Sequence, residues 1–160
     1  MRKIKAQELS VEAFAPFGSY TNILKPSGNH LGDFYHDPVK FFVSGEYPVT
    51  FSTLLVHKSE KKIIHTVEYH DTTPEGILVL DDDVLIHVAP PSVEPVPELT
   101  QAFFVPKGTL VMLDTGVWHL SAMPVNKDEA HVLIVLPERI YKRDCKVEKY
   151  AKEDQMEVNL

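Results

Sequence analysis

The chain has a single cysteine, Cys145, and therefore cannot form an internal disulfide bond. Because disulfides persist mainly in oxidising compartments, one cysteine in 160 residues favours a cytoplasmic protein. No apolar run approaches the roughly 20 residues that a membrane-spanning helix needs. The opening segment, MRKIKAQELS, has basic side chains but no apolar stretch of the kind found in secretory signals. We therefore expect a cytoplasmic protein that does not insert into membranes.

Clusters of basic residues are also absent. The chain carries 16 Lys and Arg against 23 Asp and Glu, which gives a formal net charge of −7 at pH 7. Binding to nucleic-acid phosphates needs a local excess of Lys and Arg, so no nucleic-acid partner is expected. The sequence contains no P-loop, G-x-S-x-G or G-x-G-x-x-G motif. A small-molecule partner is the expectation that remains.

Short β-strand patterns fill most of the chain. Its 160 residues, 44% of them apolar, suit one domain with a single core. Seven segments rich in Val, Ile, Leu and Phe are separated by turns with Pro, Gly or Asp: residues 49–57, 62–70, 76–81, 84–90, 101–106, 109–113 and 130–137. One helix is predicted over residues 11–17, with Ser10 as its N-cap and Gly18 at its end. The pattern predicts an all-β sandwich or barrel with a short N-terminal helix.

The predicted domain has three parts along the chain. Residues 1–48 form the N-terminal helix and an irregular arm, and residues 49–137 form the barrel core. Residues 138–160 are a charged tail, which is either a short closing strand followed by an arm or a partly disordered segment.

Several polar side chains interrupt one of the predicted strands. Glu68 and His70 are two residues apart, so they share one face of the strand. A turn through residues 71–74 returns the chain at Glu75, the start of the next strand. Two carboxylates and an imidazole on one concave surface can bind a first-row divalent metal, with His119 as a fourth ligand. The competing interpretation is a solvated strand face, since alternating polar residues on a strand commonly face water.

Two stretches together resemble the paired signatures of the cupin superfamily. Glu68-x-His70-x4-Glu75 is similar to the ligand core of the first signature, G-x5-H-x-H-x4-E-x6-G, with Glu68 where the first histidine usually stands. Residues 108–119, GTLVMLDTGVWH, are similar to the second, G-x5-P-x-G-x2-H-x3-N, and His119 matches its histidine. The resemblance implies a cupin double-stranded β-helix, which is a jelly-roll barrel.

Within the cupins, the chain resembles the ureidoglycolate lyase family, once called ureidoglycolate hydrolases. The family's first motif is like H-x-x-E-x-H-x4-Q, and residues 65–75 here are H-x-x-E-x-H-x4-E. Its V-W-H-H is similar to residues 117–120, VWHL, and its R-Y-H-D to residues 34–37, FYHD. The opening AFAPFG, residues 13–18, is similar to the family's AF…YG. The resemblance runs from about residue 9 to residue 137.

This resemblance implies a metal-dependent enzyme that cleaves ureidoglycolate to glyoxylate and urea in allantoin breakdown. It also implies a homodimer and a divalent transition metal, for which nitrogen and oxygen ligands admit Ni, Zn, Mn or Fe. The implied metal ligands are Glu68, His70, Glu75 and His119. Breaking a C–N bond at a carbon that bears a hydroxyl needs a base and an acid, and the carboxylates of Glu68 and Glu75 are the catalytic candidates. The residues expected to line the substrate pocket are Tyr35, His36 and Asp37.

Four residues depart from the family's pattern. Phe34 stands where the family has an Arg, a natural clamp for a substrate carboxylate. Glu75 replaces Gln, while Leu120 and Asp114 each replace a His. These departures keep two other hypotheses open. One is another metal-dependent cupin enzyme, such as a sugar or hydroxy-acid isomerase or epimerase, and the other is a non-catalytic cupin that binds a small molecule.

Other reactive residues are predicted to lie outside the metal site. His65 has the opposite strand parity to the predicted ligands, so we expect it to face away from them. Trp118 alternates with His119 and is expected to pack in the core or at an interface. His87 and His131 lie in apolar strands and are expected to be core or surface histidines. Cys145 lies in the charged tail with no histidine near it in sequence, so a nucleophilic role is not expected.

Overall fold

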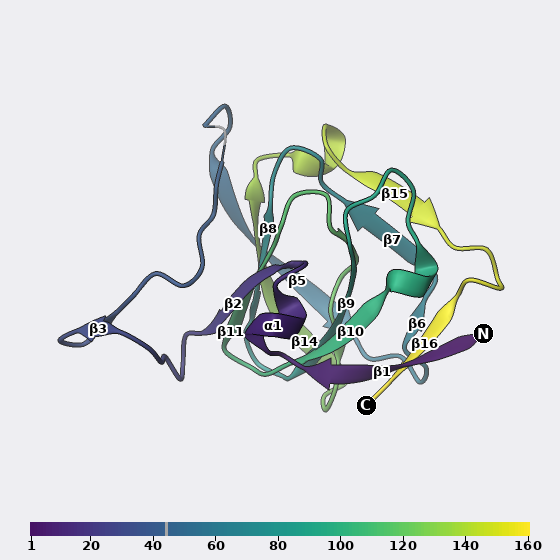
Figure 1. Ribbon diagram of the computed structural model, residues 1–160, viewed down its shortest axis with the longest axis horizontal. Coiled ribbons are helices and arrows are strands. Elements are labelled where there is room, and N and C mark those ends of the chain that lie inside the picture. Colours follow the sequence, from purple (N-terminus) through teal and green to yellow (C-terminus); the bar gives the residue numbers. More distant parts are fainter. Residues whose placement is uncertain (44) are drawn as a thin grey trace.

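The computed structural model describes residues 1–43 and 45–160, and β-strands make up almost all of its regular structure (Figure 1). Two sheets face each other across the core. The strands of the larger sheet are, in order, β15 (Lys146–Lys149), β7 (Thr66–Tyr69), β12 (Trp118–His119), β9 (Val84–Ala89), β10 (Gln101–Val105), β1 (Arg2–Glu8), β16 (Met156–Asn159) and β6 (Ile63–Ile64), with β13 (Met123–Pro124) also paired to β9. The strands of the smaller sheet are β2 (Gly18–Asn22), β11 (Thr109–Leu113), β8 (Glu75–Val79), β14 (Glu129–Pro137) and β5 (Val49–His57). The predicted all-β barrel architecture is confirmed.

The larger sheet curls until its two ends lie together, because β6 and β7 are separated in sequence only by His65. β9 runs through the middle of this sheet and is buried on both faces. Its even-numbered residues Val84, Ile86 and Val88 belong to the core between the two sheets. Its odd-numbered residue Leu85 belongs to a second apolar cluster in the hollow of the curl. The larger sheet therefore has two separate interiors, one on each face.

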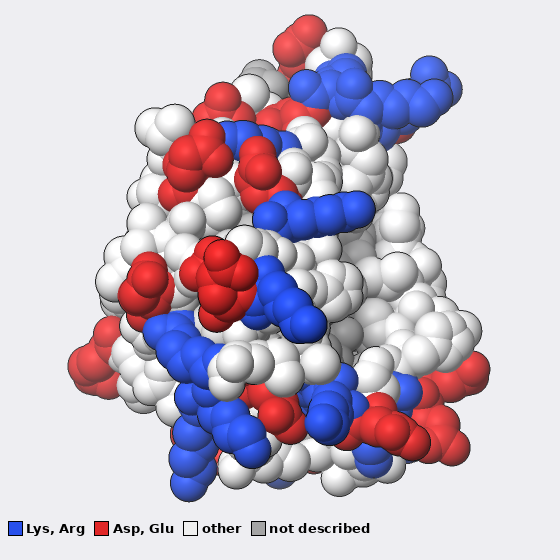
Figure 2. Space-filling view, turned by 90° about the vertical axis from the view of Figure 1, so that its right-hand side faces the viewer, with Lys and Arg blue, Asp and Glu red and all other residues white. Residues whose placement is uncertain are grey.

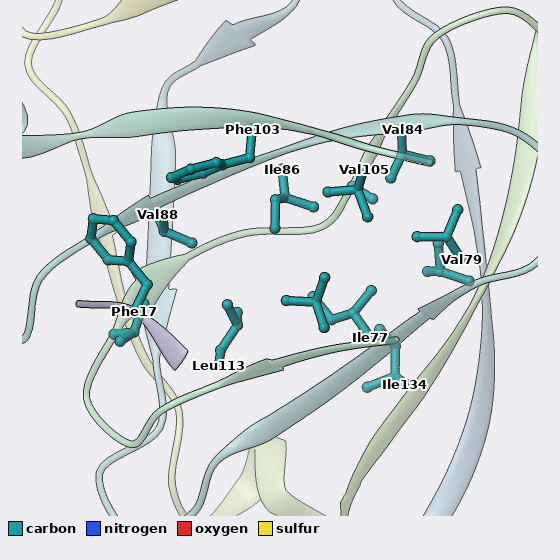
Figure 3. Packing of buried hydrophobic residues seen from close by; sticks show 14 of the residues in the cluster. Phe17, Ile77, Val79, Val84, Ile86, Val88, Phe103, Val105, Leu113 and Ile134 are labelled. Atoms are coloured by element: carbon teal, nitrogen blue, oxygen red, sulfur yellow. The ribbon is translucent and has the colours of Figure 1, made fainter. Parts of the chain in front are cut away.

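The main core lies between the two sheets. Figure 3 shows Phe103, Ile86 and Val105 of the larger sheet directed toward Leu113 and Ile77 of the smaller one. All five side chains are at most 1% exposed. Burying an aliphatic or aromatic side chain of this kind contributes about 1.5–3 kcal/mol, so the core fixes how the two sheets lie against each other.

The only α-helix among the described residues is α1 (Val11–Phe14), shorter than the predicted helix over 11–17. Ser10 caps it as predicted, because its Oγ accepts a hydrogen bond of 3.1 Å from the backbone N–H of Ala13. The helix ends early because Pro16 has no N–H group with which to continue the helical hydrogen bonds.

The structure has strands at both ends of the chain: β1, which the sequence pattern did not predict, and β15 and β16 in the tail, where a short closing strand was one of the two alternatives. β1 pairs in parallel with both β10 and β16, and β15 pairs antiparallel to β7. In β1, Ile4 and Ala6 pack against the cluster in the curl, while the residues that alternate with them, Lys3, Lys5 and Gln7, are charged or polar. Such short segments of alternating charge resemble exposed loops when only the local sequence is considered.

An arm connects β2 to β5 and stands apart from the two sheets (Figure 1). At its tip, β3 (His30–Leu31) and β4 (Phe34–Tyr35) form a two-stranded hairpin. On the face that carries β15, basic and acidic side chains are interspersed rather than segregated (Figure 2). Within the described residues, no helix has both the length and the apolar character needed to cross a membrane.

Candidate metal centre

Four predicted ligand residues lie together at one end of the space between the sheets. β12 pairs with β7 so that His119 lies directly opposite Glu68. His70 follows β7 at the position two residues beyond Glu68, on the same face. Glu75 is the first residue of β8, across the core in the smaller sheet. Strand pairing thus brings residues from positions 68 to 119 into one cluster.

The distances within the cluster suit a metal ion. One ligand atom each from Glu68, His70 and His119 lies within 4.8 Å of the other two. Glu75 lies against both imidazoles: its Oε2 is 3.0 Å from Nε2 of His70 and 3.1 Å from Nε2 of His119. His70, Glu75 and His119 are only 2%, 5% and 3% exposed, so the carboxylate meets both rings away from bulk water.

The hydrogen bonds of the two histidines fix which ring nitrogen faces the cluster. Nδ1 of His70 donates to the carbonyl oxygen of Asp144 at 2.6 Å, and Nδ1 of His119 donates to that of Val117 at 2.8 Å. A carbonyl can only accept, so each Nδ1 carries a proton. The Nε2 lone pair of each ring is then directed at the carboxylate of Glu75, which is also an acceptor. These contacts are stable only when a cation, either protons on the imidazoles or a metal ion, lies between the groups.

The pKa shifts of Glu75 and His119 also favour positive charge next to the carboxylate. Burial raises the pKa of Glu75, but the charge of His119 and hydrogen bonds from both imidazoles lower it more, to about 2. Burial lowers the pKa of His119, but the carboxylate of Glu75 more than compensates, and the pKa lies above its usual value. The cluster therefore stabilises a cation beside a buried carboxylate. Two imidazoles and carboxylate oxygens are a donor set that first-row divalent metals accept, so these residues fit such an ion.

Comparison with known proteins identifies the family. The family model described as ureidoglycolate lyase matches residues 1–159. The chain belongs to the ureidoglycolate lyase family. The match extends through the C-terminal tail, which the sequence resemblance left uncovered. No curated protein matches the sequence.

Among solved structures, this ureidoglycolate lyase family member is similar to RmlC from Streptococcus suis, solved in complex with dTDP-D-xylose. The two share 12% sequence identity, with a TM-score of 0.39. The similarity covers 66% of this chain and 46% of that one, so the matched part is less than half of the RmlC chain.

The tail of this family member contributes side chains beside the cluster that the sequence did not indicate. Pairing of β15 with β7 sets Val147 opposite Glu68 and brings Cys145 within reach of the same carboxylate. The Cys145 thiol donates to Oε2 of Glu68 at 3.3 Å. Burial, followed by the nearby charge of Glu68, raises the pKa of Cys145 to about 12, so the thiol stays protonated at neutral pH. No signal in the local sequence links Cys145 to Glu68, because their proximity depends on long-range strand pairing.

Tyr141 is a second contribution of the tail. Its ring centroid lies 6.0 Å from that of His70. Burial, followed by the charges of Glu75 and Glu68, raises its pKa, so the phenol also keeps its proton. Tyr141 and Arg139 line a cavity of about 130 Å³ that also includes Thr50 and Ser52 of β5. This cavity is next to the metal centre, because Tyr141 lines the cavity and its ring also contacts that of His70.

The structure does not bring the predicted substrate residues Tyr35, His36 and Asp37 to the cluster of their own chain. They lie on the arm, where they help to line a shallow surface pocket of about 260 Å³. Phe34 is on the same arm and is 76% exposed. In this structure the arm therefore does not contribute residues to the cluster of its own chain.

His65 and Trp118, which the sequence placed outside the metal site, are not part of the ligand cluster. His65 lines a different cavity, and its Nδ1 is 2.8 Å from Oγ1 of Thr66. Trp118 is fully buried and packs edge-to-face on Tyr69 with ring centroids 4.5 Å apart. The predictions that His65 faces away and that Trp118 packs in the core agree with these positions.

Proposed function

We propose that this chain is a metal-dependent ureidoglycolate lyase that cleaves ureidoglycolate into glyoxylate and urea. Membership of the family supports the substrate. The observation that carries the proposal is the meeting of two imidazole lone pairs with the carboxylate of Glu75, an arrangement that needs a cation. A divalent transition metal held by Glu68, His70 and His119, with Glu75 as a fourth ligand or a free base, meets that need.

When bound, the metal supplies Lewis acidity toward oxygen atoms of the substrate. The reaction converts the hydroxyl-bearing carbon to a carbonyl, and the electron pair of the broken C–N bond goes to the nitrogen of urea. Glu75 is placed to carry the proton: its Oε2 contacts both imidazoles, and among the described residues its Oε1 has no hydrogen-bond donor. Oε1 takes the proton from the substrate hydroxyl and returns it to the departing nitrogen, which balances the reaction. The second carboxylate, that of Glu68, would serve as a ligand of the metal together with His70 and His119.

The substrate carboxylate needs a cationic partner, which Phe34 cannot provide. Arg139 is among the residues that line the cavity of about 130 Å³, and its Nε lies 3.2 Å from a carboxylate oxygen of Glu138. Its backbone has φ = 57°, a left-handed conformation that is uncommon outside glycine. We assign Arg139 to the substrate carboxylate because its planar fork of donors matches that group.

A homodimer and a cytoplasmic location complete the proposal. The arm exposes apolar side chains that a second copy could cover, among them Leu31 at 87%, Phe34 at 76% and Phe42 at 75% exposed. An arm that reaches a second copy would also bring Tyr35, His36 and Asp37 to a substrate site. The single cysteine supports a reducing compartment. Analytical ultracentrifugation of Phe34→Asp tests the dimer, since a charge on a covered apolar surface should produce monomers.

The decisive experiment has two parts. Metal-replete protein is assayed for release of glyoxylate and urea from racemic ureidoglycolate, and a protein that turns over no substrate contradicts the lyase proposal. Elemental analysis is then applied to Glu68→Ala and His119→Ala, each of which should lose most of its metal. His131→Ala is the matched control, because His131 pairs with Asp81 on the surface, 2.7 Å away. Unchanged metal content in both site variants contradicts the proposed centre.

A further inference from the structure

Tyr141 lies at the solvent-facing side of the proposed metal centre. It belongs to the short 3₁₀-helix η2 (Ile140–Lys142), and its ring centroid is 6.0 Å from that of His70, with the two rings at 73°. It is 60% exposed, whereas His70, Glu75 and His119 are at most 5% exposed. Tyr141 therefore lies at the boundary between the buried ligands and the solvent from which a substrate arrives.

The backbone that carries Tyr141 is fixed on both sides. Ile140, the residue before it, is 4% exposed and belongs to the core between the sheets. Asp144, three residues after it, binds the turn after β7 through its carboxylate and His70 through its carbonyl oxygen. The backbone N–H of Asp144 also donates to the carbonyl oxygen of Ile140 at 2.8 Å, which closes the segment. A backbone held in this way presents its side chain to a ligand without prior rearrangement.

The hydroxyl of Tyr141 is a donor that the protein does not use. Other donors near the centre are engaged: the Cys145 thiol with Glu68, and the Thr72 hydroxyl with a carboxylate of the tail. The Tyr141 hydroxyl has no hydrogen-bond partner among the described residues. After burial, the charges of Glu75 and Glu68 contribute to the raised pKa of Tyr141, so its hydroxyl lies within electrostatic range of both carboxylates. A phenol carries its proton at neutral pH and can donate it in a hydrogen bond to a bound ligand.

The proposed substrate has three polar groups, and two of them are already matched. Its carboxylate is assigned to Arg139, and its hydroxyl gives a proton to Glu75, so neither needs a neutral donor. The third is the ureido group, whose carbonyl oxygen accepts hydrogen bonds. When the C–N bond breaks, the electron pair moves to the nitrogen and, through conjugation, in part to this oxygen. A donor on the oxygen therefore stabilises charge that develops only in the transition state.

We propose that Tyr141 is a catalytic residue that recognises the ureido group: its phenol O–H donates a hydrogen bond to the carbonyl oxygen of the departing urea. Tyr141 keeps its proton throughout, and the proton that reaches the nitrogen is the one carried by Glu75. The inference rests on the proposed lyase function and adds to it the residue that selects for a ureido leaving group.

The variant Tyr141→Phe removes the hydroxyl and keeps the ring against His70. In metal-replete protein, its kcat for ureidoglycolate should fall about 100-fold while KM changes by less than about threefold, because the hydrogen bond is strongest in the transition state. Its metal content and its urea unfolding curve should match those of the parent, since the hydroxyl has no partner among the described residues. Tyr150→Phe is the matched control: Tyr150 lies in the apolar cluster of the curl, and its variant should leave kcat and KM unchanged.

Calorimetric titration of the same metal-replete proteins tests the contact without turnover. N-carbamoylglycine carries the ureido group and the carboxylate but lacks the hydroxyl that the reaction needs. Glycolate carries the carboxylate and the hydroxyl but no ureido group. Tyr141→Phe should weaken the binding of N-carbamoylglycine about fivefold and leave that of glycolate unchanged.

The outcomes separate this inference from the lyase proposal. If the parent protein turns over no ureidoglycolate, the lyase proposal fails, and a selective loss of N-carbamoylglycine binding in Tyr141→Phe still supports the contact. The contact is refuted if turnover by Tyr141→Phe stays within about threefold of the parent. Equal weakening of both ligands, unchanged binding of N-carbamoylglycine, or a parent protein that does not bind it also refutes the contact.

Discussion

Asp144 is the residue through which the C-terminal tail holds the metal centre, and its removal makes the sharpest test of that link. Its carboxylate closes the turn after β7: Oδ1 accepts from the N–H of Asp71 at 2.6 Å, and Oδ2 accepts from the N–H of Thr72 at 2.8 Å and its hydroxyl at 2.5 Å. Its own carbonyl oxygen accepts from Nδ1 of His70 at 2.6 Å. One residue therefore anchors the turn and sets the ring orientation of a proposed ligand.

The expected loss can be worked out from these contacts. Hydrogen bonds to charged groups contribute about 1.5–3 kcal/mol each, so three of them set an upper limit of about 5–9 kcal/mol. The turn is open to solvent, and water replaces part of what is lost, so Asp144→Ala should lower the free energy of unfolding by about 2 kcal/mol. Freed from the turn, the carbonyl no longer fixes His70. Loss of such an outer partner typically lowers metal affinity by about 10-fold to 100-fold.

Urea unfolding measures the first effect, and competitive metal titration measures the second. Asp144→Asn should lie between the parent and Asp144→Ala, since its amide retains one oxygen acceptor. Glu153→Ala is the control: it removes an exposed carboxylate from the same tail and should change neither quantity. If Asp144→Ala is destabilised but keeps its metal affinity within twofold, then the carboxylate holds the turn and not the ligand, and the reasoning is wrong.

Three further predictions follow from other contacts. Burial raises the pKa of Asp82, but hydrogen bonds from the backbone N–H groups of residues 126 and 127 lower it more. The ionised carboxylate therefore stabilises the folded state above the unfolded pKa of about 3.9, and this contribution is lost as the pH falls through the lower folded pKa. Asp82→Ala should flatten the acid limb of a curve of unfolding free energy against pH. His87→Leu removes a buried polar group without a partner and should raise the free energy of unfolding by about 1 kcal/mol in urea titrations, and a loss of stability would contradict this account. Glu75→Gln supplies an amide that donates to an imidazole without any cation, so metal affinity should fall about tenfold in titrations while the metal-free protein stays as stable; tighter metal binding would be the contrary result.

The alternation of apolar and polar residues in the sequence predicted most of the strands of the barrel, and it predicted which residues share a face at the candidate site. The spacing of Glu68 and His70 implied a shared face, and parity implied that His65 faces elsewhere, both of which the structure shows. The contribution of the tail could not be predicted in this way. Asp144 and Cys145 approach the centre only because β15 pairs with β7, and the charged, alternating sequence of β15 does not specify its partner strand. The parallel pairing of β1 was hidden for the same reason.

The departures from the family's pattern have unequal consequences once their positions are known. Phe34 is on the arm, Asp114 is exposed at a turn, and Leu120, which follows His119 in the chain, lines a cavity of about 490 Å³, so none of the three is part of the ligand cluster. Glu75 alone lies within the centre. A glutamine at this position can donate its amide hydrogens to an imidazole lone pair, so it satisfies the site without a cation. A glutamate cannot do so, which makes a cation at this centre a stricter requirement in this chain than the family pattern alone would imply.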